Sequence, residues 1–397
     1  MIELSLADRI SEIKYSPIRR ISEKAARLEA DGKRIIHFES GRPDFDTPPH
    51  IKEAAYRALK EGMVHYAPSS GIPELREAIA ESLLQHKGVK YDPGSEIMVT
   101  SGGQEALFIM LQALIGPGDE VLVPDPGYGP FYTSITLAGG TAIPIPFRNE
   151  KSIAPDLDEA KRLLSERTKA IIINSPHNPT GGVLSSKEVE ETCEFAKENN
   201  LLVVSDEAYD RILYAGSDYL SPASVQGMKS HVVICGTLSK TYSMTGWRVG
   251  YLAGRKEVIG AAIKVHQNVI LSVCSFAQAG AVAALRGPQD CVDTMVEEYA
   301  RRREVILTGI ARAPGLSCPV APLGAFYVFA KYQTPGLNSE AFSDLLVEEA
   351  GVAVVPGSGF GIRGEGFLRI SYARALEDCA EGMERIVRFM SKHVETA

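Results

Sequence analysis

The chain has 397 residues, of which 45% are hydrophobic and 23% are charged, a composition typical of soluble globular proteins. Its length predicts more than one compact unit, because single hydrophobic cores stop growing beyond about 250–300 residues. The formal net charge of −8 disfavours a general nucleic-acid binder, and no basic block with interleaved aromatic residues suggests one. No apolar run approaches the ~18 residues of a membrane span, so we expect no membrane association.

The amino-terminal segment MIELSLADRISEIKYSP carries scattered charges and no apolar core, which argues against a secretory signal. The six cysteines are far apart and form no CxxC pair. This spacing predicts neither a disulfide framework nor a metal site. We therefore expect a cytoplasmic protein whose cysteines pack as small hydrophobic side chains.

The first hundred residues are predicted to form helices and one short strand, separated by turn-rich loops. Apolar residues recur on one helical face, and prolines and glycines mark where helices begin and end. In chain order, the expected elements are a loose arm (1–16), a helix (17–30), a strand (34–39), a loop (41–49), a helix (50–61), a loop (65–71) and a helix ending near residue 86.

From residue 96 onward, strands and helices alternate. The strands are expected at 96–100, 120–124, 141–146, 169–174, 201–207, 231–235 and 248–254. The helices between them are expected at 103–115, 129–138, 156–166 and 186–199. The strands are apolar throughout instead of alternating, which predicts a mostly parallel, seven-stranded sheet covered by helices on both faces. Prolines in the strand TAIPIP place it at an edge or at a strand end.

The last third of the chain is predicted to be mainly helical at first and mixed afterwards. A helical stretch should run from 255 to about 312, with one break near Gly287-Pro288. Residues 313–397 should form a smaller α+β unit, with GAFYVFA and FLRISYA as strands and helices near 339–350 and 376–393. We therefore divide the chain into an arm and first part of a small domain (1–42), a large domain (43–285) and a carboxyl-terminal small domain (286–397).

One lysine and one arginine stand out in the segment TLSKTYSMTGWRVG, residues 237–250. Lys240 follows a predicted buried strand and lies between two hydroxyl side chains. It suits a Schiff-base nucleophile, because partial burial or a nearby cation would lower its pKa. Arg248 lies two residues from a glycine on each side and suits a phosphate clamp. The alternative interpretation of Lys240 is a solvated surface lysine.

Two further motifs follow predicted strands. In SGGQEAL, Gly102 and Gly103 lie where a strand ends and a helix begins, a place where free backbone N–H groups can bind an anion. The alternative is a simple helix cap with Ser101 as the capping residue. In DPGYGPF, Tyr128 could stack on a planar ring, and its alternative role is that of a packing tyrosine.

Three more candidates lie at strand ends or within a strand. Asn178 follows a strand in NSPHNPTG, where an ordinary turn is the alternative. Asp206 in SDEAY ends a buried strand; it could face a pyridinium nitrogen or cap a helix, and Tyr209 could bond a phenolic oxygen. Arg369 lies inside the apolar strand FLRISYA and needs an anion, either a ligand carboxylate or an internal acidic partner.

Taken together and in chain order, these motifs resemble the class I/II aminotransferases, the pyridoxal 5'-phosphate (PLP) enzymes of fold type I. The resemblance extends from about Gly41 to Tyr372. The matching segments are GRPDFDTP, HYAPSSG, SGGQEAL, PGYGPF, NSPHNPTG, SDEAY, SKTYSMTGWRVG and FLRIS. The resemblance implies an α/β fold whose large domain binds PLP, an amino acid and a 2-oxo acid as substrates, and a homodimer with shared active sites.

The resemblance also implies roles for individual residues. Lys240 would form the Schiff base with PLP and later move a proton between substrate and cofactor. The cofactor ring would contact Tyr128, Asn178, Asp206 and Tyr209. The phosphate would be held by Gly102, Gly103, Gln104, Thr237, Ser239 and Arg248, together with Tyr66 of the partner subunit. The substrate carboxylate would be bound by Gly41, Asn178 and Arg369.

The chain departs from the family pattern at two positions. Thr237 stands where the family usually has Ser or Gly, although its hydroxyl can still bind phosphate. Gln104 stands where some aspartate-specific members have a lysine for the distal carboxylate, which weakens an aspartate interpretation. The region of Ile13 to Ile18, together with Tyr66, Tyr128 and Phe326-Tyr327, points weakly to an apolar or aromatic substrate.

Two other functions use the same motifs. A carbon–sulfur β-lyase on this scaffold needs the same Schiff base and proton abstraction. A non-catalytic, PLP-binding regulator is disfavoured, because Lys240 is present and no DNA-binding segment precedes residue 17. The leading prediction is therefore an amino-acid aminotransferase.

Overall fold

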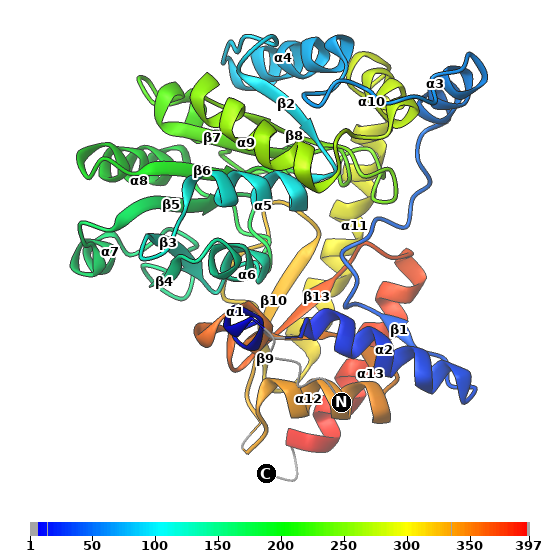
Figure 1. Ribbon diagram of the computed structural model, residues 1–397. Helices are drawn as coiled ribbons and strands as arrows, with labels where there is room; N and C mark the ends of the chain where they lie inside the picture. The colour runs from blue at the N-terminus through cyan, green and yellow to red at the C-terminus, as the bar shows by residue number, and fades with distance from the viewer. Residues whose placement is uncertain (1–6, 14, 335, 395–397) are drawn as a thin grey trace, which may run out of the picture.

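A seven-stranded sheet and a four-stranded sheet organise the computed structural model, together with a two-stranded pair (Figure 1). The structure describes residues 7–13, 15–334 and 336–394, so the predicted arm at 1–16 is described only in part. The helices are α1 (Asp8–Ser11), α2 (Pro17–Ala30), α3 (Pro49–Lys60), α4 (Pro73–Lys87), α5 (Gly103–Leu114), α6 (Pro130–Leu137), α7 (Leu157–Leu163), α8 (Ser186–Glu198), α9 (Lys256–Val269), α10 (Ser275–Arg286), α11 (Asp290–Arg312), α12 (Ser339–Glu349) and α13 (Leu376–Val394). The strands are β1 (Ile36–His37), β2 (Ile97–Thr100), β3 (Glu120–Asp125), β4 (Thr141–Pro146), β5 (Thr168–Asn174), β6 (Leu202–Asp206), β7 (Val232–Thr237), β8 (Gly250–Ala253), β9 (Leu316–Ser317), β10 (Tyr327–Tyr332), β11 (Val352–Ala353), β12 (Val355–Pro356) and β13 (Phe367–Ser371).

The large sheet has the strand order β2-β8-β7-β6-β5-β3-β4. The strands β7, β6, β5, β3 and β4 run parallel, whereas β8 is antiparallel to both β2 and β7. The proline-containing strand β4 lies at the edge, because proline cannot donate a hydrogen bond to a second neighbour. The sequence therefore predicted the α/β class and the mostly parallel sheet correctly.

Helices cover both faces of this sheet, which explains why its strands are apolar throughout. In β5, Ile171 and Ile173 belong to the core shared with α4, α8 and α10, whereas Ile172 belongs to the core shared with α5, α6 and α9. Successive side chains of a strand point to opposite faces, so both faces need apolar residues. Each fully buried aliphatic side chain of this kind contributes roughly 1.5–3 kcal/mol of transfer free energy.

The smaller sheet is antiparallel, with the order β12-β13-β10-β9, and it is built beside the pair β1-β11. The amino-terminal strand β1 thus pairs with a strand from the last fifth of the chain, and α2 lies beside α12 in Figure 1. The aromatic side chains Phe38, Tyr299, Phe326 and Tyr372 form much of its core. The long helix α11 passes from the first core to the second.

Several boundaries differ from the sequence-based expectations. The stretch from 255 to 312 contains a second break between α9 and α10, where Leu271 adopts a positive φ of 66° without any glycine or proline to signal it. The strand expected at 34–39 is only two residues long, because its partner β11 is equally short. Part of the expected loose arm forms the short helix α1.

In the part of the chain that the structure describes, no helix is both long enough and apolar enough to traverse a lipid bilayer.

Candidate active site

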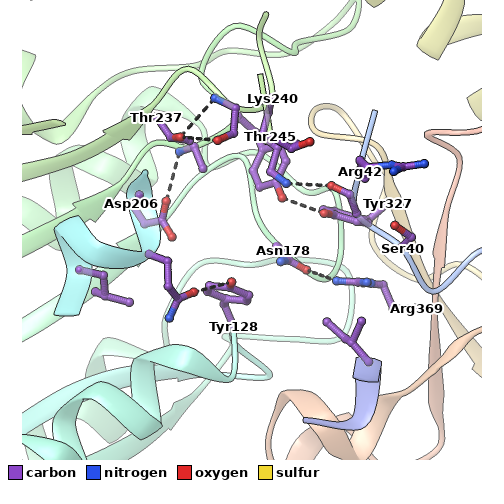
Figure 2. A pocket seen from close by; sticks show the side chains of 18 of the residues that line it. Ser40, Arg42, Tyr128, Asn178, Asp206, Thr237, Lys240, Thr245, Tyr327 and Arg369 are labelled. Carbon is purple, nitrogen blue, oxygen red and sulfur yellow. Dashed lines mark hydrogen bonds between the residues drawn. The ribbon is translucent and has the colours of Figure 1, made fainter. Parts of the chain in front are cut away.

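A pocket of about 470 Å³ lies where the ends of the large sheet's strands meet β10 and β13 (Figure 2). Most of the predicted site residues line it. These are Gly41, Gly103, Gln104, Tyr128, Asn178, Asp206, Tyr209, Thr237, Ser239, Lys240, Arg248 and Arg369. Of the other two, Gly102 lies directly behind Arg248, and Tyr66 is 85% exposed outside the pocket. The structure therefore brings together residues that are more than 300 positions apart in the sequence.

The strand register places the chemical groups at one level. Asn174 of β5 is opposite Asp206 of β6, and Asp206 is opposite Cys235 of β7. Parallel strands end at the same edge of a sheet, so the segments that follow β5, β6 and β7 converge there. Asn178, Asp206 and Lys240 come from these three segments and reach the same pocket.

The antiparallel strand β8 brings Arg248 to this edge. Its first residue, Gly250, pairs with Thr100 at the end of β2 and with Thr237 at the end of β7. Arg248, two residues earlier, donates a hydrogen bond of 3.1 Å to the carbonyl oxygen of Ser101. A parallel β8 would carry the arginine to the opposite edge, so the strand direction decides whether Arg248 can serve the pocket.

The turn before α5 is a tight, glycine-dependent cradle. Gly102 has a φ of +80°, and a Cβ there would lie 2.6 Å from Nη2 of Arg248. A Cβ on Gly250 would lie 2.6 Å from the carbonyl carbon of Gly102. The first residue of the helix is Gly103, and no side chain caps its amino terminus, so the alternative in which Ser101 is the cap is wrong. Free N–H groups at a helix amino terminus favour an anion.

Two hydroxyl side chains complete the cradle. The backbone N–H of Ser239 donates to Oγ1 of Thr237 at 3.2 Å, and the two hydroxyls are 3.0 Å apart. Thr237 therefore keeps the hydroxyl that the family resemblance requires, and it lines the pocket beside Ser239.

Lys240 points into the pocket and is not a solvated surface lysine. Its Nζ donates a hydrogen bond of 2.8 Å to the carbonyl oxygen of Gly41. Burial is the main cause that lowers its pKa to about 8, and the guanidinium groups of Arg369 and Arg248 lower it further. The sequence-based expectation of an amine that can lose its proton near neutral pH is thus supported by the environment of Lys240.

Asp206 has the opposite shift. Burial raises the pKa of its carboxyl to about 7, although a 3.1 Å hydrogen bond from the N–H of Ala208 acts against the change. No helix follows this residue, so the helix-cap alternative is wrong. Asn174 links the neighbouring segments, because its side chain donates to the carbonyl oxygen of Asp206 at 3.2 Å and accepts from the N–H of Asn178 at 3.0 Å.

Arg369 on β13 is 1% exposed and makes no ion pair with any residue that the structure describes. It donates to Oδ1 of Asn178 at 3.2 Å and to the carbonyl oxygen of Glu39 at 2.5 Å, while its buried Nε has no partner. The faces of Tyr327 and Phe360 lie 4.5 Å and 5.2 Å from its guanidinium carbon. The alternative of an internal acidic partner is therefore wrong, and the guanidinium can bind an anion that enters the pocket.

Tyrosines form the pocket wall on both sides. The hydroxyl of Tyr128 donates to Oε1 of Gln104 at 2.9 Å, and its ring packs edge-on against Phe131. The hydroxyls of Tyr209 and Tyr327 are 2.7 Å apart. Burial raises the pKa of Tyr209 well above its usual value, so its phenol remains a hydrogen-bond donor.

Several lining residues were not predicted as site residues from the sequence. They are Ser40, Arg42, Leu107, Ala208 and Thr245. Arg42 is the most informative of them, because this exposed arginine at the pocket makes no hydrogen bond or ion pair within the described residues. The sequence could have pointed to Arg42, because in the motif GRPDFDTPP this arginine stands between a glycine and a proline in a predicted loop. Of the side-chain-pocket candidates, Ile18 and Tyr327 line the pocket, whereas Phe326 does not; residue 14, inside the candidate range from Ile13 to Ile18, lies outside the described residues.

Comparison with known protein families shows to which family the chain belongs. The family model described as "Aminotransferase class I and II" matches residues 33–386. The chain belongs to this family. It is an amino-acid aminotransferase, as the motifs predicted.

Related proteins cover nearly the whole length of this aminotransferase. A "Probable aspartate/prephenate aminotransferase" from Aquifex aeolicus is 42% identical, over 98% of this chain and 99% of the relative. An "Aromatic-amino-acid aminotransferase 2" from Thermococcus litoralis is 39% identical, over 98% of this chain and 99% of the relative. The solved structure of an aspartate aminotransferase from Thermus thermophilus with maleate has a TM-score of 0.91 and 38% identity, and covers 97% of this chain and all of that one.

Proposed function

We propose that this aminotransferase uses pyridoxal 5'-phosphate, held at Lys240, to transfer an amino group between an L-amino acid and a 2-oxo acid. The observation that carries the proposal is the convergence in one pocket of Lys240, Asp206, the glycine cradle before α5 and the buried Arg369. Each group occurs in many proteins, but together they match the aldehyde, the ring nitrogen, the phosphate and the substrate carboxylate.

The charges of the pocket support this ligand. Its charged lining residues are Arg42, Lys240, Arg248 and Arg369 on the positive side and Asp206 on the negative side. A phosphate ester plus a carboxylate would balance this excess. The close approach of Gly102 and Gly250 leaves room for backbone only, so an anion there would contact N–H groups and the hydroxyls of the Thr237 turn.

When bound, the cofactor supplies an aldehyde carbon that amines attack and a ring that withdraws electrons. Asp206 would face the ring nitrogen. Burial raises the pKa of the Asp206 carboxyl to about 7, so a protonated ring nitrogen beside it would be enough to favour the ionised carboxylate. Lys240 would provide the amine and, once released, carry a proton at Nζ. A pKa of about 8 leaves roughly a tenth of the amine neutral at pH 7 and about half of it neutral at pH 8.

Arg369 would hold the substrate carboxylate bidentately, with the side chain of Asn178 keeping the guanidinium in place. Tyr128 would stack on one side of the ring, and the hydroxyl of Tyr209 would reach the ring oxygen. The experiment is a spectroscopic titration of the purified protein. An amino acid should bleach a visible absorbance band and a 2-oxo acid should restore it; ammonia and pyruvate released from cysteine without bleaching would contradict the proposal.

We also propose that the pocket accepts substrates with a second carboxylate. The support is Arg42, which lines the pocket without an acidic partner in the described chain, and the relatives named for aspartate. Arg42→Gln should lower kcat/KM for aspartate by roughly 2- to 5-fold, because a solvent-exposed charge contact contributes up to about 1 kcal/mol, and it should leave phenylalanine unaffected. Equal losses of kcat/KM for both donors would show that Arg42 does not contact the side chain of the substrate.

A homodimer with shared active sites is proposed from an exposed apolar surface. This surface, which we name the α3–α10 face, includes Tyr56, Leu59, Val269, Ile270 and Leu271, all exposed although apolar. A hollow of about 730 Å³ lies in it, and Phe276 and Ala277 of α10 line this hollow together with Tyr56 and Leu59 of α3. Apolar patches of this kind mark association sites. Tyr66 is exposed and would reach the phosphate of the partner subunit.

Domain limits and compartment are proposed on similar grounds. We divide the chain into a large domain at 43–285 and a small domain made from 1–42 and 286–397, because separate hydrophobic clusters surround the two sheets and the pocket lies between them.

The cytoplasm is proposed as the compartment. Its support is that all six cysteines are free thiols in the structure.

A further inference from the structure

A buried ionic cluster lies directly behind the turn that carries Asp206, outside the pocket. We name Lys87, Glu207 and Asp210 the Lys87 cluster. Lys87 is the last residue of α4, and its side chain is 3% exposed. Its Nζ contacts Oε2 of Glu207 and lies 2.5 Å from Oδ2 of Asp210. Burying such a group is costly unless its charge is balanced, so the cluster calls for an explanation.

The carboxylate of Glu207 is 1% exposed and has donors on both oxygens. Oε1 accepts from Ser221 at 2.6 Å and from Ser205 at 2.8 Å. Oε2 accepts from Tyr219 at 3.0 Å in addition to Lys87. Among the described residues, Lys87 is the only cation that pairs with Glu207, and its single positive charge is shared with Asp210.

The same turn serves the pocket and the Lys87 cluster. Asp206 and Tyr209 line the pocket, whereas Glu207 and Asp210 face Lys87. Backbone hydrogen bonds hold the turn together, with the N–H of Glu207 bonded to the carbonyl of Cys235 and the N–H of Asp210 to that of Glu207. Each acidic residue that pairs with Lys87 is therefore adjacent in the chain to a residue that lines the pocket.

We propose that Lys87 is a positioning residue of this aminotransferase: by neutralising Glu207 and anchoring the turn, it keeps the Asp206 carboxylate ionised and directed into the pocket. This inference rests on the proposed function, in which Asp206 faces the ring nitrogen. With Lys87 present, a proton shared between Asp206 and the ring nitrogen would stay on the nitrogen. Without Lys87, the uncompensated charge of Glu207, the residue next to Asp206, would favour the proton on the Asp206 carboxyl.

The surrounding charges support this direction. The negative charge of Glu207 is one cause that raises the pKa of Asp206, whereas Lys240 lowers it. Burial raises the pKa values of the three phenols near Glu207, so these groups stay neutral in the neutral pH range. The titratable and charged groups that face the cluster are Tyr91, Tyr219, Tyr251, His86, Arg211 and Tyr242; those that face Asp206 are Glu207, Lys240, Tyr128, Tyr327 and Cys235.

The test measures the protonation of the ring nitrogen directly. The full-length enzyme is loaded with pyridoxal 5'-phosphate labelled with ¹⁵N in the ring, and the ¹⁵N chemical shift is followed against pH. Lys87→Met should lower the ratio of protonated to unprotonated ring nitrogen about 10-fold at neutral pH, because the proton moves to Asp206 within the protein. kcat should fall in parallel while KM stays nearly constant.

Three further variants show whether the effect of Lys87→Met comes from the lost positive charge or from a disturbed fold. Lys87→Arg should behave as the wild type, and Glu207→Gln in the Lys87→Met background should restore the ¹⁵N shift. Lys229→Met is the matched control, because Lys229 pairs with Glu96 at 2.8 Å and is 42% exposed. If Lys87→Met does not fold, Glu207→Gln alone decides, since removal of this negative charge should disfavour the proton on Asp206 and raise the ratio of protonated to unprotonated ring nitrogen.

Two results would overturn the inference: an unchanged ¹⁵N titration in Lys87→Met, or a folded double variant with no recovery. An unchanged titration in Glu207→Gln alone would do the same where Lys87→Met does not fold. These outcomes differ from failure of the proposed function. A wild-type protein that retains no pyridoxal 5'-phosphate refutes the cofactor assignment, whereas a loaded wild type with an insensitive Lys87 variant refutes only the role of Lys87.

Discussion

Replacing Arg369 by methionine should abolish recognition of the substrate carboxylate and leave the fold nearly as stable. The side chain is buried, and it has no acidic partner among the described residues. A buried cation of this kind is poorly explained as a stabilising element, because its desolvation costs several kcal/mol. Its position is explained if an anionic substrate completes its environment.

The two effects can be put in numbers. The substrate carboxylate would form two charge-assisted hydrogen bonds, each of roughly 1.5–3 kcal/mol, so kcat/KM should fall about 10²–10⁴-fold. For folding, Arg369→Met loses the bonds to Asn178 and to the carbonyl of Glu39, but it also removes the cost of burying an unpaired charge. These contributions nearly offset each other, and the free energy of unfolding should change by less than about 2 kcal/mol.

The assay compares two amine donors. Phenylalanine carries the carboxylate and 2-phenylethylamine lacks it, so the variant should lose activity with the first and keep the low activity with the second. Arg302→Met is a matched control, because Arg302 is also buried but pairs with Asp44 at 2.7 Å and Glu298 at 3.0 Å. That variant should lose about 3–5 kcal/mol of stability, as expected for a broken buried ion pair, and keep the wild-type ratio between the donors.

The reasoning fails if Arg369→Met unfolds like a broken ion pair, with a loss above about 4 kcal/mol. It also fails if the ratio between the two donors does not change, since Arg369 would then not contact the carboxylate.

Three other outcomes follow from the same structure. Lys240→Ala should fold and show no turnover, and wild-type rates in that variant would remove Lys240 from the reaction. Asp206→Asn in the cofactor-free chain should gain stability relative to wild type as the pH rises from about 4 to about 7. Burial raises the pKa of Asp206 to about 7, so over this range the folded wild-type chain retains a proton that the unfolded chain has released, and wild type loses stability as the pH rises. Urea unfolding at several pH values measures this, and a constant difference between the two proteins contradicts it. Ile270→Asp on the α3–α10 face should shift sedimentation from dimer to monomer, whereas Ile362→Asp, on another exposed apolar residue, should not; a dimeric Ile270→Asp variant would exclude this face.

Much of the site could be predicted because its residues follow strands. Asp206 and Lys240 come directly after apolar runs that are recognisable as buried strands, and parallel strands deliver the segments that follow them to one edge. The roles of these residues came from the family resemblance, since an isolated lysine or aspartate has several structural explanations. The resemblance was specific because eight motifs occur in one order.

Other features could not be found in this way. The break between α9 and α10 has no glycine or proline, so the helical pattern continued through it. Arg42 was overlooked because a loop arginine is usually solvated, and only the structure shows that it lines the pocket. The ionic partners of Lys87 lie 120 and 123 residues away, a distance over which local patterns carry no information.

The amino-acid sequence by itself determined the local order of strands and helices, the glycine turns and the set of chemical groups, because these depend on periodicity and on backbone preferences within a few residues. Tertiary structure decided the rest. The direction of β8 placed Arg248 beside Gly102, and Arg369 was left buried without an acidic partner, within the part of the chain that the structure describes. Burial then moved the pKa values of Lys240 and Asp206 toward neutrality, since the cost of desolvating a charge depends on every segment that packs around it.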